Sequence, residues 1–108
     1  MSEQDDILDR VFAVIESRKG ADASSSYVAS LYAKGREKIT GKVTEEAGEL
    51  VQAALGEGDA RTVSESADLL FHMMVLWAEM GLTPDDIRAE LARREGISGH
   101  DEKASRTR

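Results

Sequence analysis

Cysteine is absent from the 108-residue chain, and proline occurs only once. The lack of cysteine excludes disulfide bonds and thiolate metal sites, and it fits a reducing compartment. A single proline, together with few runs of β-branched residues, indicates helix through most of the chain. A chain of this length can bury a hydrophobic core without cross-links. We therefore expect one all-α domain that spans residues 1–108.

Long hydrophobic runs and an excess of positive charge are also missing. No apolar stretch approaches the ~20 residues of a transmembrane helix. The N-terminal sequence, Met1-Ser2-Glu3-Gln4-Asp5-Asp6, is acidic and lacks the basic start and apolar run of a secretory signal. The formal net charge of −7 argues against non-specific binding to nucleic acid or to a membrane. The sequence thus predicts a soluble, cytoplasmic protein with neither kind of partner.

Hydrophobic periodicity and capping residues predict about five helices and a polar tail. The expected helices cover residues 6–18, 27–34, 36–55, 60–80 and 84–94, within a helical core over 5–95. Their expected N-terminal caps are Asp5 or Asp6, Ser26, Asp59 and Thr83. Residues 96–108 follow as the polar C-terminal tail.

The third predicted helix contains the segment Lys42-Val43-Thr44-Glu45-Glu46-Ala47-Gly48-Glu49. At 100° per residue, its apolar side chains share one arc that should face the core: Ile39, Val43, Ala47, Leu50 and Ala54. The charged side chains occupy the neighbouring arc, where Glu46 lies nearest the apolar stripe and Glu45 furthest from it. Glu46 and Glu49 are therefore predicted to point inward, whereas Glu45 suits an outer role such as orienting water.

A second pair of carboxylates, Glu65 and Asp68, lies in the most apolar segment of the chain. From Ala67 to Ala78, only Asp68 and His72 interrupt an apolar series that covers nearly the whole circumference of the fourth helix. Such a helix is either central or faces a second subunit. Because an unpaired carboxylate is costly to bury, this pair indicates a cationic partner.

Together the two pairs predict an all-oxygen metal site, with Glu46, Glu49, Glu65 and Asp68 as ligands. Such ligands favour Mg²⁺, or Mn²⁺, over zinc. The ion would neutralise a polyphosphate and lower the pKa of an attacking water, which Glu45 could hold or deprotonate. The predicted catalytic residues are Glu45, Glu46 and Glu49. The alternative is a solvated acidic face, which is common on glutamate-rich helices.

Basic side chains near the acidic segment are candidates for binding phosphate, although a solvated charged segment is an equally good interpretation. His72 continues the polar stripe of the fourth helix and could be a metal ligand, a donor to a ligand or a substrate contact. A histidine among apolar neighbours is, however, more often a core residue. The predicted substrate contacts are Lys34, Arg36, Lys42, His72, Arg93 and Arg94.

The acidic pattern, Glu46-x-x-Glu49, fifteen intervening residues, then Glu65-x-x-Asp68, resembles the metal signature of the all-α nucleoside triphosphate pyrophosphohydrolases, the MazG-like superfamily. A narrower resemblance covers residues 5–106 and is to the phosphoribosyl-ATP pyrophosphatase family. It rests on the segments Ser26–Gly35, Lys42–Ala47, Ala67–His72, Leu91–Arg94 and Gly96–Arg106.

This resemblance implies an antiparallel, MazG-like helical bundle that is completed in a homodimer. It also implies Mg²⁺-dependent hydrolysis of phosphoribosyl-ATP to phosphoribosyl-AMP and pyrophosphate, the second step of histidine biosynthesis. Two other functions remain open from the residues alone. One is a housecleaning hydrolase of nucleoside triphosphates, and the other is a non-enzymatic helical module whose acids form a solvated face.

Overall fold

The computed structural model describes residues 6–106, and this part of the chain folds into helices without a β-strand. The helices are α1 (Ile7–Ser17), α2 (Tyr27–Lys34), α3 (Arg36–Gly56), α4 (Asp59–Met80), α5 (Pro84–Arg94) and α6 (Gly99–Arg106). The prediction of an all-α fold is confirmed. Among the described residues, no helix combines the length and the hydrophobicity needed to cross a lipid bilayer.

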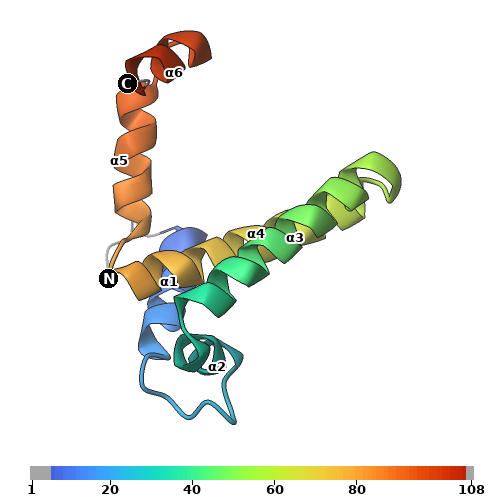
Figure 1. Cartoon of the computed structure of the whole chain (residues 1–108), viewed down its shortest axis with the longest axis vertical. Helices are drawn as coiled ribbons and strands as arrows, with labels where there is room; N and C mark the ends of the chain where they lie inside the picture. The colour runs from blue at the N-terminus through green and yellow to red at the C-terminus, as the bar shows by residue number, and fades with distance from the viewer. Residues whose placement is uncertain (1–5, 107–108) are drawn as a thin grey trace.

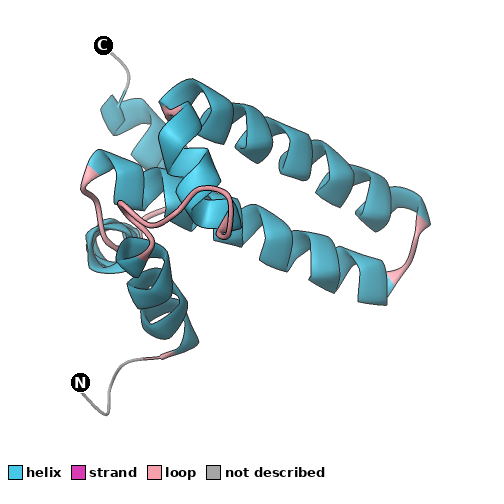
Figure 2. Cartoon of the chain, turned by 90° about the horizontal axis from the view of Figure 1, so that it is seen from below, coloured by secondary structure: helices cyan, strands magenta, loops and turns pink. Residues whose placement is uncertain are grey.

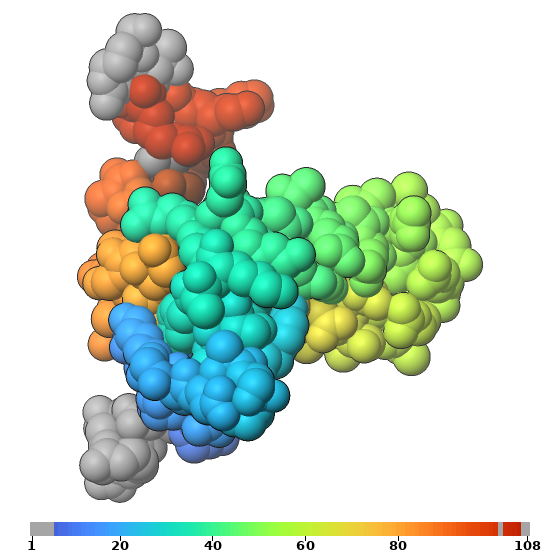
Figure 3. Space-filling view, turned by 60° about the horizontal axis from the view of Figure 1, so that its bottom comes forward, coloured from blue at the N-terminus to red at the C-terminus, as the bar shows by residue number. Residues whose placement is uncertain are grey.

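Helices α3 and α4 form a long antiparallel hairpin, in which they lie side by side in both ribbon views (Figure 1, Figure 2). The turn between them contains Gly58, whose φ of 94° lies in the region that favours glycine. The tip of the hairpin projects beyond the rest of the molecule (Figure 3). The hairpin is therefore packed within this chain at one end only.

The hydrophobic core lies at the base of the hairpin, where α1 and α2 cover it. Its buried side chains come from all four helices: Phe12, Ile15, Val28, Leu31, Ile39, Met74, Val75 and Ala78. The hydroxyl of Tyr32 on α2 donates a hydrogen bond of 3.0 Å to the carbonyl of Ile15 on α1. The core thus fixes α1 and α2 against one end of the two long helices.

The buried face of α3 differs from the predicted arc. Residues spaced by seven, Ile39, Glu46 and Ala53, are buried, whereas Ala54 is exposed. The remaining members of the predicted arc, Val43, Ala47 and Leu50, are half-buried. The observed arc is rotated by about 60° from the predicted one, toward the acidic side chains. The reason is tertiary, because α4 packs along the Glu46 side of α3.

The predicted caps at Asp6, Ser26 and Thr83 are present. Each side chain accepts a backbone hydrogen bond, as in the 3.1 Å contact from the Ala29 amide to Ser26 Oγ. The prediction for Asp59 is wrong, because this residue is already helical and follows Gly58, which provides no side-chain cap. Asp5, the other candidate for the first cap, lies outside the described residues.

Helix α6 was not predicted from the polar tail. The amide of Asp101 donates a hydrogen bond of 3.0 Å to Ser98 Oγ, which is the contact of an N-terminal cap. The serine before Gly99 was therefore the signal for this helix. The segment is polar throughout, so it has no apolar periodicity that would indicate a helix.

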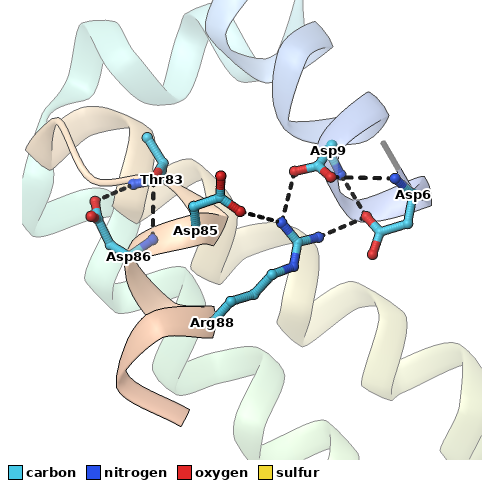
Figure 4. A network of polar contacts seen from close by, with 6 residues as sticks. All are labelled: Asp6, Asp9, Thr83, Asp85, Asp86 and Arg88. Carbon is cyan, nitrogen blue, oxygen red and sulfur yellow. Dashed lines mark hydrogen bonds and ion pairs between the residues drawn. The ribbon is translucent and has the colours of Figure 1, made fainter. Parts of the chain in front are cut away.

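Helices α5 and α6 form an arm that extends away from the hairpin (Figure 1). The arm is attached to α1 through Arg88, whose guanidinium contacts three carboxylates (Figure 4). Its nitrogen atoms lie 2.7 Å from Asp6, 2.9 Å from Asp9 and 2.8 Å from Asp85. Hydrogen bonds to these carboxylates raise the pKa of Arg88. The first turns of α1 and α5 are thereby joined.

Candidate metal centre

Five carboxylates gather on the facing sides of α3 and α4. One group consists of Glu45, Glu46 and Glu49, which can place one oxygen each within 4.8 Å of one another. A second group with the same spacing consists of Glu46, Glu65 and Asp68. Glu46 belongs to both groups and connects them. The structure thus brings the four predicted ligands together, and their binding of a metal stays a prediction.

The cluster has a buried floor and an exposed rim. The floor consists of Glu46 and Glu65, which expose only 7% and 3% of their surface. Glu45, Glu49 and Asp68 are exposed and form the rim. Glu46 and Glu45 lie as the helical wheel predicted, whereas the prediction that Glu49 points inward is wrong, because Glu49 is exposed. The rim is thus open to solvent, whereas one oxygen of each floor residue is buried beneath it.

Two buried oxygens of the floor, Glu46 Oε1 and Glu65 Oε1, have no hydrogen-bond partner among the described residues. Burial raises the pKa of Glu65, and the neighbouring carboxylates of Glu49 and Asp68 raise it further. The Arg61 guanidinium, 2.6 Å from Glu65 Oε2, acts in the opposite direction. Buried polar atoms normally have partners, because leaving them without one is costly. A cation bound between the two carboxylates would remove this cost.

Within residues 6–106, the ion pairs of Lys42 and Arg61 with the cluster do not balance its charge. Burial lowers the pKa of Lys42, but Glu45 and Glu46, at 3.2 Å and 3.6 Å, help to raise it overall. Lys42 and Arg61 are two cations against the five carboxylates of the cluster. The donor set is entirely oxygen, which suits Mg²⁺ or Mn²⁺. The residues present therefore fit a hard divalent ion.

His72 lies one turn after Asp68 and is buried between the rings of Tyr27 and Phe71. Its Nδ1 is 2.8 Å from the Asp68 carbonyl, which can only accept, so Nδ1 carries the proton. In the neutral ring, Nε2 then accepts from the Tyr27 hydroxyl at 2.8 Å. Both nitrogens are engaged, which makes His72 a poor candidate for direct contact with metal or substrate.

Tyr27 is the side chain beside the cluster to which sequence reasoning gave no role. Its hydroxyl fixes the imidazole of His72, and it also lies close enough to Lys42 to influence the pKa of that amine. A tyrosine next to the Ser26 cap carries no distinctive spacing relative to the acids. Only the packing of α2 against α4 reveals the contact.

Of the six predicted substrate contacts, only Lys42 and His72 lie at the cluster. Arg36 pairs with Glu79 at 2.7 Å and precedes Glu46 by ten residues, about 15 Å along α3. Lys34 is exposed at the end of α2. Arg93 and Arg94 on the arm both pair with Glu90, whose pKa they lower to about 2. Phosphate binding by these four residues stays a prediction.

Comparison with known proteins gives a consistent result. Residues 8–95 match the family model described as phosphoribosyl-ATP pyrophosphohydrolase. A phosphoribosyl-ATP pyrophosphatase of Rhodospirillum rubrum is 56% identical over 101 residues, which cover 94% of this chain and 86% of that protein. The protein of that name from Paramagnetospirillum magneticum is 53% identical over 108 residues, which cover 100% of this chain and 99% of that protein. Its counterpart from Geobacter sulfurreducens is 53% identical over 106 residues, covering 98% of each chain.

Proposed function

The chain belongs to the phosphoribosyl-ATP pyrophosphohydrolase family, and we propose that it hydrolyses phosphoribosyl-ATP to phosphoribosyl-AMP and pyrophosphate. In this family the reaction is the second step of histidine biosynthesis. The structural observation that carries the proposal is the pair of buried, unpartnered oxygens on Glu46 and Glu65. A solvated acidic face would not place these atoms in the interior. A binding module without catalytic activity is also disfavoured by the relatives, which are named as enzymes.

We propose Mg²⁺ as the cofactor, with Mn²⁺ as a possible substitute, held by Glu46, Glu49, Glu65 and Asp68. When bound, the ion would neutralise the polyphosphate and lower the pKa of the attacking water. Support comes from the all-oxygen donor set and from the excess of carboxylates over neighbouring cations.

The surrounding residues have separate tasks in this proposal. Glu45 is exposed at the rim, where its carboxylate can hold the attacking water and accept its proton. Lys42 contacts Glu45 and Glu46, so it sets the charge beside the position of the water. Arg61 holds one oxygen of Glu65 and leaves the other oxygen for the ion. The Tyr27–His72 contact maintains the shape of the wall next to Asp68.

We further propose that the enzyme is a homodimer. The chain exposes 7306 Å² of surface, whereas a folded monomer of 11.8 kDa exposes about 5,900 Å². Its radius of gyration of 16.0 Å also exceeds the ~13 Å of a compact chain of this length. Apolar side chains are exposed on the outer half of the hairpin, including Leu55 at 83% and Val63 at 69%. A second copy that packs on the hairpin would cover them.

Analytical ultracentrifugation of the wild type tests the homodimer, with twice the mass of one chain as the expected result. Leu55→Asp should shift the equilibrium toward the monomer. Leu91→Asp, a matched change on the exposed part of the arm, should leave the mass unchanged. A wild type that sediments as a single chain would contradict the homodimer.

A cytoplasmic location is also part of the proposal, and the absence of cysteine and the biosynthetic role of the family support it.

The activity is tested by following pyrophosphate release from purified phosphoribosyl-ATP in excess Mg²⁺ and, separately, in excess chelator. We expect turnover only with the metal. Competition against dCTP separates this function from general hydrolysis of nucleoside triphosphates. A preference for dCTP would replace the proposed substrate while leaving the reaction class intact.

A further inference from the structure

Asp68 lines not only the acidic cluster but also a cavity between α1 and α4. This cavity has a volume of about 410 Å³, and Asp68 is its only charged lining residue. The remaining walls are apolar and include Leu8, Val11, Leu70 and Phe71. An apolar slot that begins at a candidate metal ligand suits a flat aromatic ring connected to a charged phosphate chain.

A second cavity, of about 590 Å³, adjoins the first and shares Val11 and Phe71 with it. It lies at the C-terminal end of α1, and its lining differs in chemistry. Polar side chains contribute to its wall, namely Arg18, Ser25, Ser26 and Tyr27. We refer to the two adjoining cavities together as the trough; its lining becomes more polar and gains a positive charge with distance from Asp68.

Helix geometry gives the scale of the trough. Phe71 follows Asp68 by three residues, about 4.5 Å along α4, and Arg18 follows Val11 by seven residues, about 10.5 Å along α1. Triphosphate, base and a further phosphorylated sugar follow one another in phosphoribosyl-ATP. The order of chemistry in the trough is the same: carboxylates suited to a metal, an apolar slot, and a polar end with a cation.

Arg18 is distinguished from other arginines by the absence of an acidic partner. Arg36, Arg61 and Arg88 each pair with carboxylates, whereas the Arg18 guanidinium makes no ion pair with a residue in the range 6–106. In a chain of net charge −7, such an arginine is available to an external anion. Its planar guanidinium matches a phosphate monoester, which it can bind through two hydrogen bonds.

We propose that the trough binds the nucleoside part of phosphoribosyl-ATP, an inference that rests on the proposed function. In this arrangement Arg18 binds the phosphate of the N-linked ribose. The adenine occupies the apolar slot between α1 and α4. The second ribose lies in the polar cavity beside Ser25 and Tyr27. Arg18 is then the residue that distinguishes phosphoribosyl-ATP from ATP, which has no group to reach it.

The test compares wild type with Arg18→Gln in steady-state pyrophosphate release. We expect KM for phosphoribosyl-ATP to rise by about 10- to 100-fold, the range for one charge-assisted phosphate contact, with kcat changed less than about threefold. The inhibition constant of ATP should stay within about twofold, because ATP lacks the second phosphate. Arg18→Lys should restore part of the affinity. Lys19→Gln removes a neighbouring charge that pairs with Glu16, and it should leave KM unchanged.

Several results would overturn the assignment. An unchanged KM in Arg18→Gln would remove Arg18 from the binding site. Equal weakening of ATP and phosphoribosyl-ATP would indicate a general defect of the site. A change in sedimenting mass would assign the trough to a contact between copies of the chain. A wild type that does not cleave phosphoribosyl-ATP would refute the proposed function itself, which is a separate and recognisable outcome.

Discussion

The acids on α3 and α4 and the acids around Arg88 are similar in composition but opposite in burial and in how their oxygens are hydrogen-bonded. Asp6, Asp9 and Asp85 surround one guanidinium at 2.7 Å to 2.9 Å (Figure 4). On the hairpin, Glu46 and Glu65 each keep one buried oxygen without a partner. The first group is hydrogen-bonded within the chain, whereas the second keeps two buried acceptors that a bound cation would satisfy.

This contrast separates a structural role from a binding role better than the number of acids does. The Arg88 group joins two helices that otherwise make little contact, and each of its three acids pairs with the guanidinium. The hairpin group weakens the protein in the absence of a ligand, because its burial raises the pKa of Glu65. A cost that the fold retains at one position is typical of a functional site.

The strongest test of this contrast is to replace a carboxylate by its amide in each group. Glu49→Gln and Asp68→Asn should each lower kcat/KM for pyrophosphate release by at least about 100-fold, since each removes a charged metal ligand. Asp85→Asn makes the same change beside Arg88 and should leave activity within about twofold. Circular dichroism should show native helicity in all three. Full activity in either hairpin variant would refute the site assignment.

Metal addition should affect one group only. With Mg²⁺ at 100 times its dissociation constant, the folded protein should gain about 2.7 kcal/mol of stability. The gain would be observed in chemical unfolding with and without Mg²⁺. Glu46→Gln should abolish it, because Glu46 belongs to both halves of the cluster. Asp85→Asn should retain it, and a response that survives Glu46→Gln would place the ion elsewhere.

Removal of the cation from the Arg88 group should have a structural effect. Arg88→Ala leaves Asp6, Asp9 and Asp85 near one another without a counter-charge, so we expect the melting temperature to fall by a few degrees. Because the group lies at the start of the arm, kcat should be unchanged. High salt should reduce the difference from wild type. If kcat falls as strongly as in Asp68→Asn, the two groups are not independent.

The smallest expected effect is a difference in the sign of the pH dependence, measured on metal-free protein. The pKa of Asp6 is lowered below its ordinary value of 3.8 by a hydrogen bond from the backbone amide of Asp9 and by the Arg88 guanidinium. The ionised Asp6 therefore stabilises the fold above pH 3.8, and this contribution is lost as the pH falls further. Burial raises the pKa of Glu65 above its ordinary 4.5, so its contribution is favourable below pH 4.5 and is lost as pH rises through the folded-state pKa.

Urea unfolding across this pH range would measure both contributions. The stability difference between wild type and Asp6→Asn should shrink toward acid pH. Glu65→Gln should instead become more stable relative to wild type as pH rises above 4.5. Parallel pH profiles for the two variants would contradict the distinction between the groups.

The sequence by itself determined helices α1 to α5 and the identity of the acids, although it did not reveal α6. Side-chain caps at Ser26 and Thr83 start their helices in the structure as predicted, because a cap depends on residues within a single turn. The spacing of the acids also sufficed to place Glu46 inward and Glu45 outward. These properties follow from local geometry, which the order of residues fixes.

The tertiary structure decided which faces meet. The packing of the helices turned the buried side of α3 toward Glu46 and brought Tyr27 into contact with His72. It also placed Arg93 and Arg94 on the α5 arm, away from the acidic cluster of α3 and α4. It also left two carboxylate oxygens buried without partners, which changes four acids at regular spacing into a candidate metal centre. No local rule predicts these features, because each depends on how helices distant in the sequence pack together.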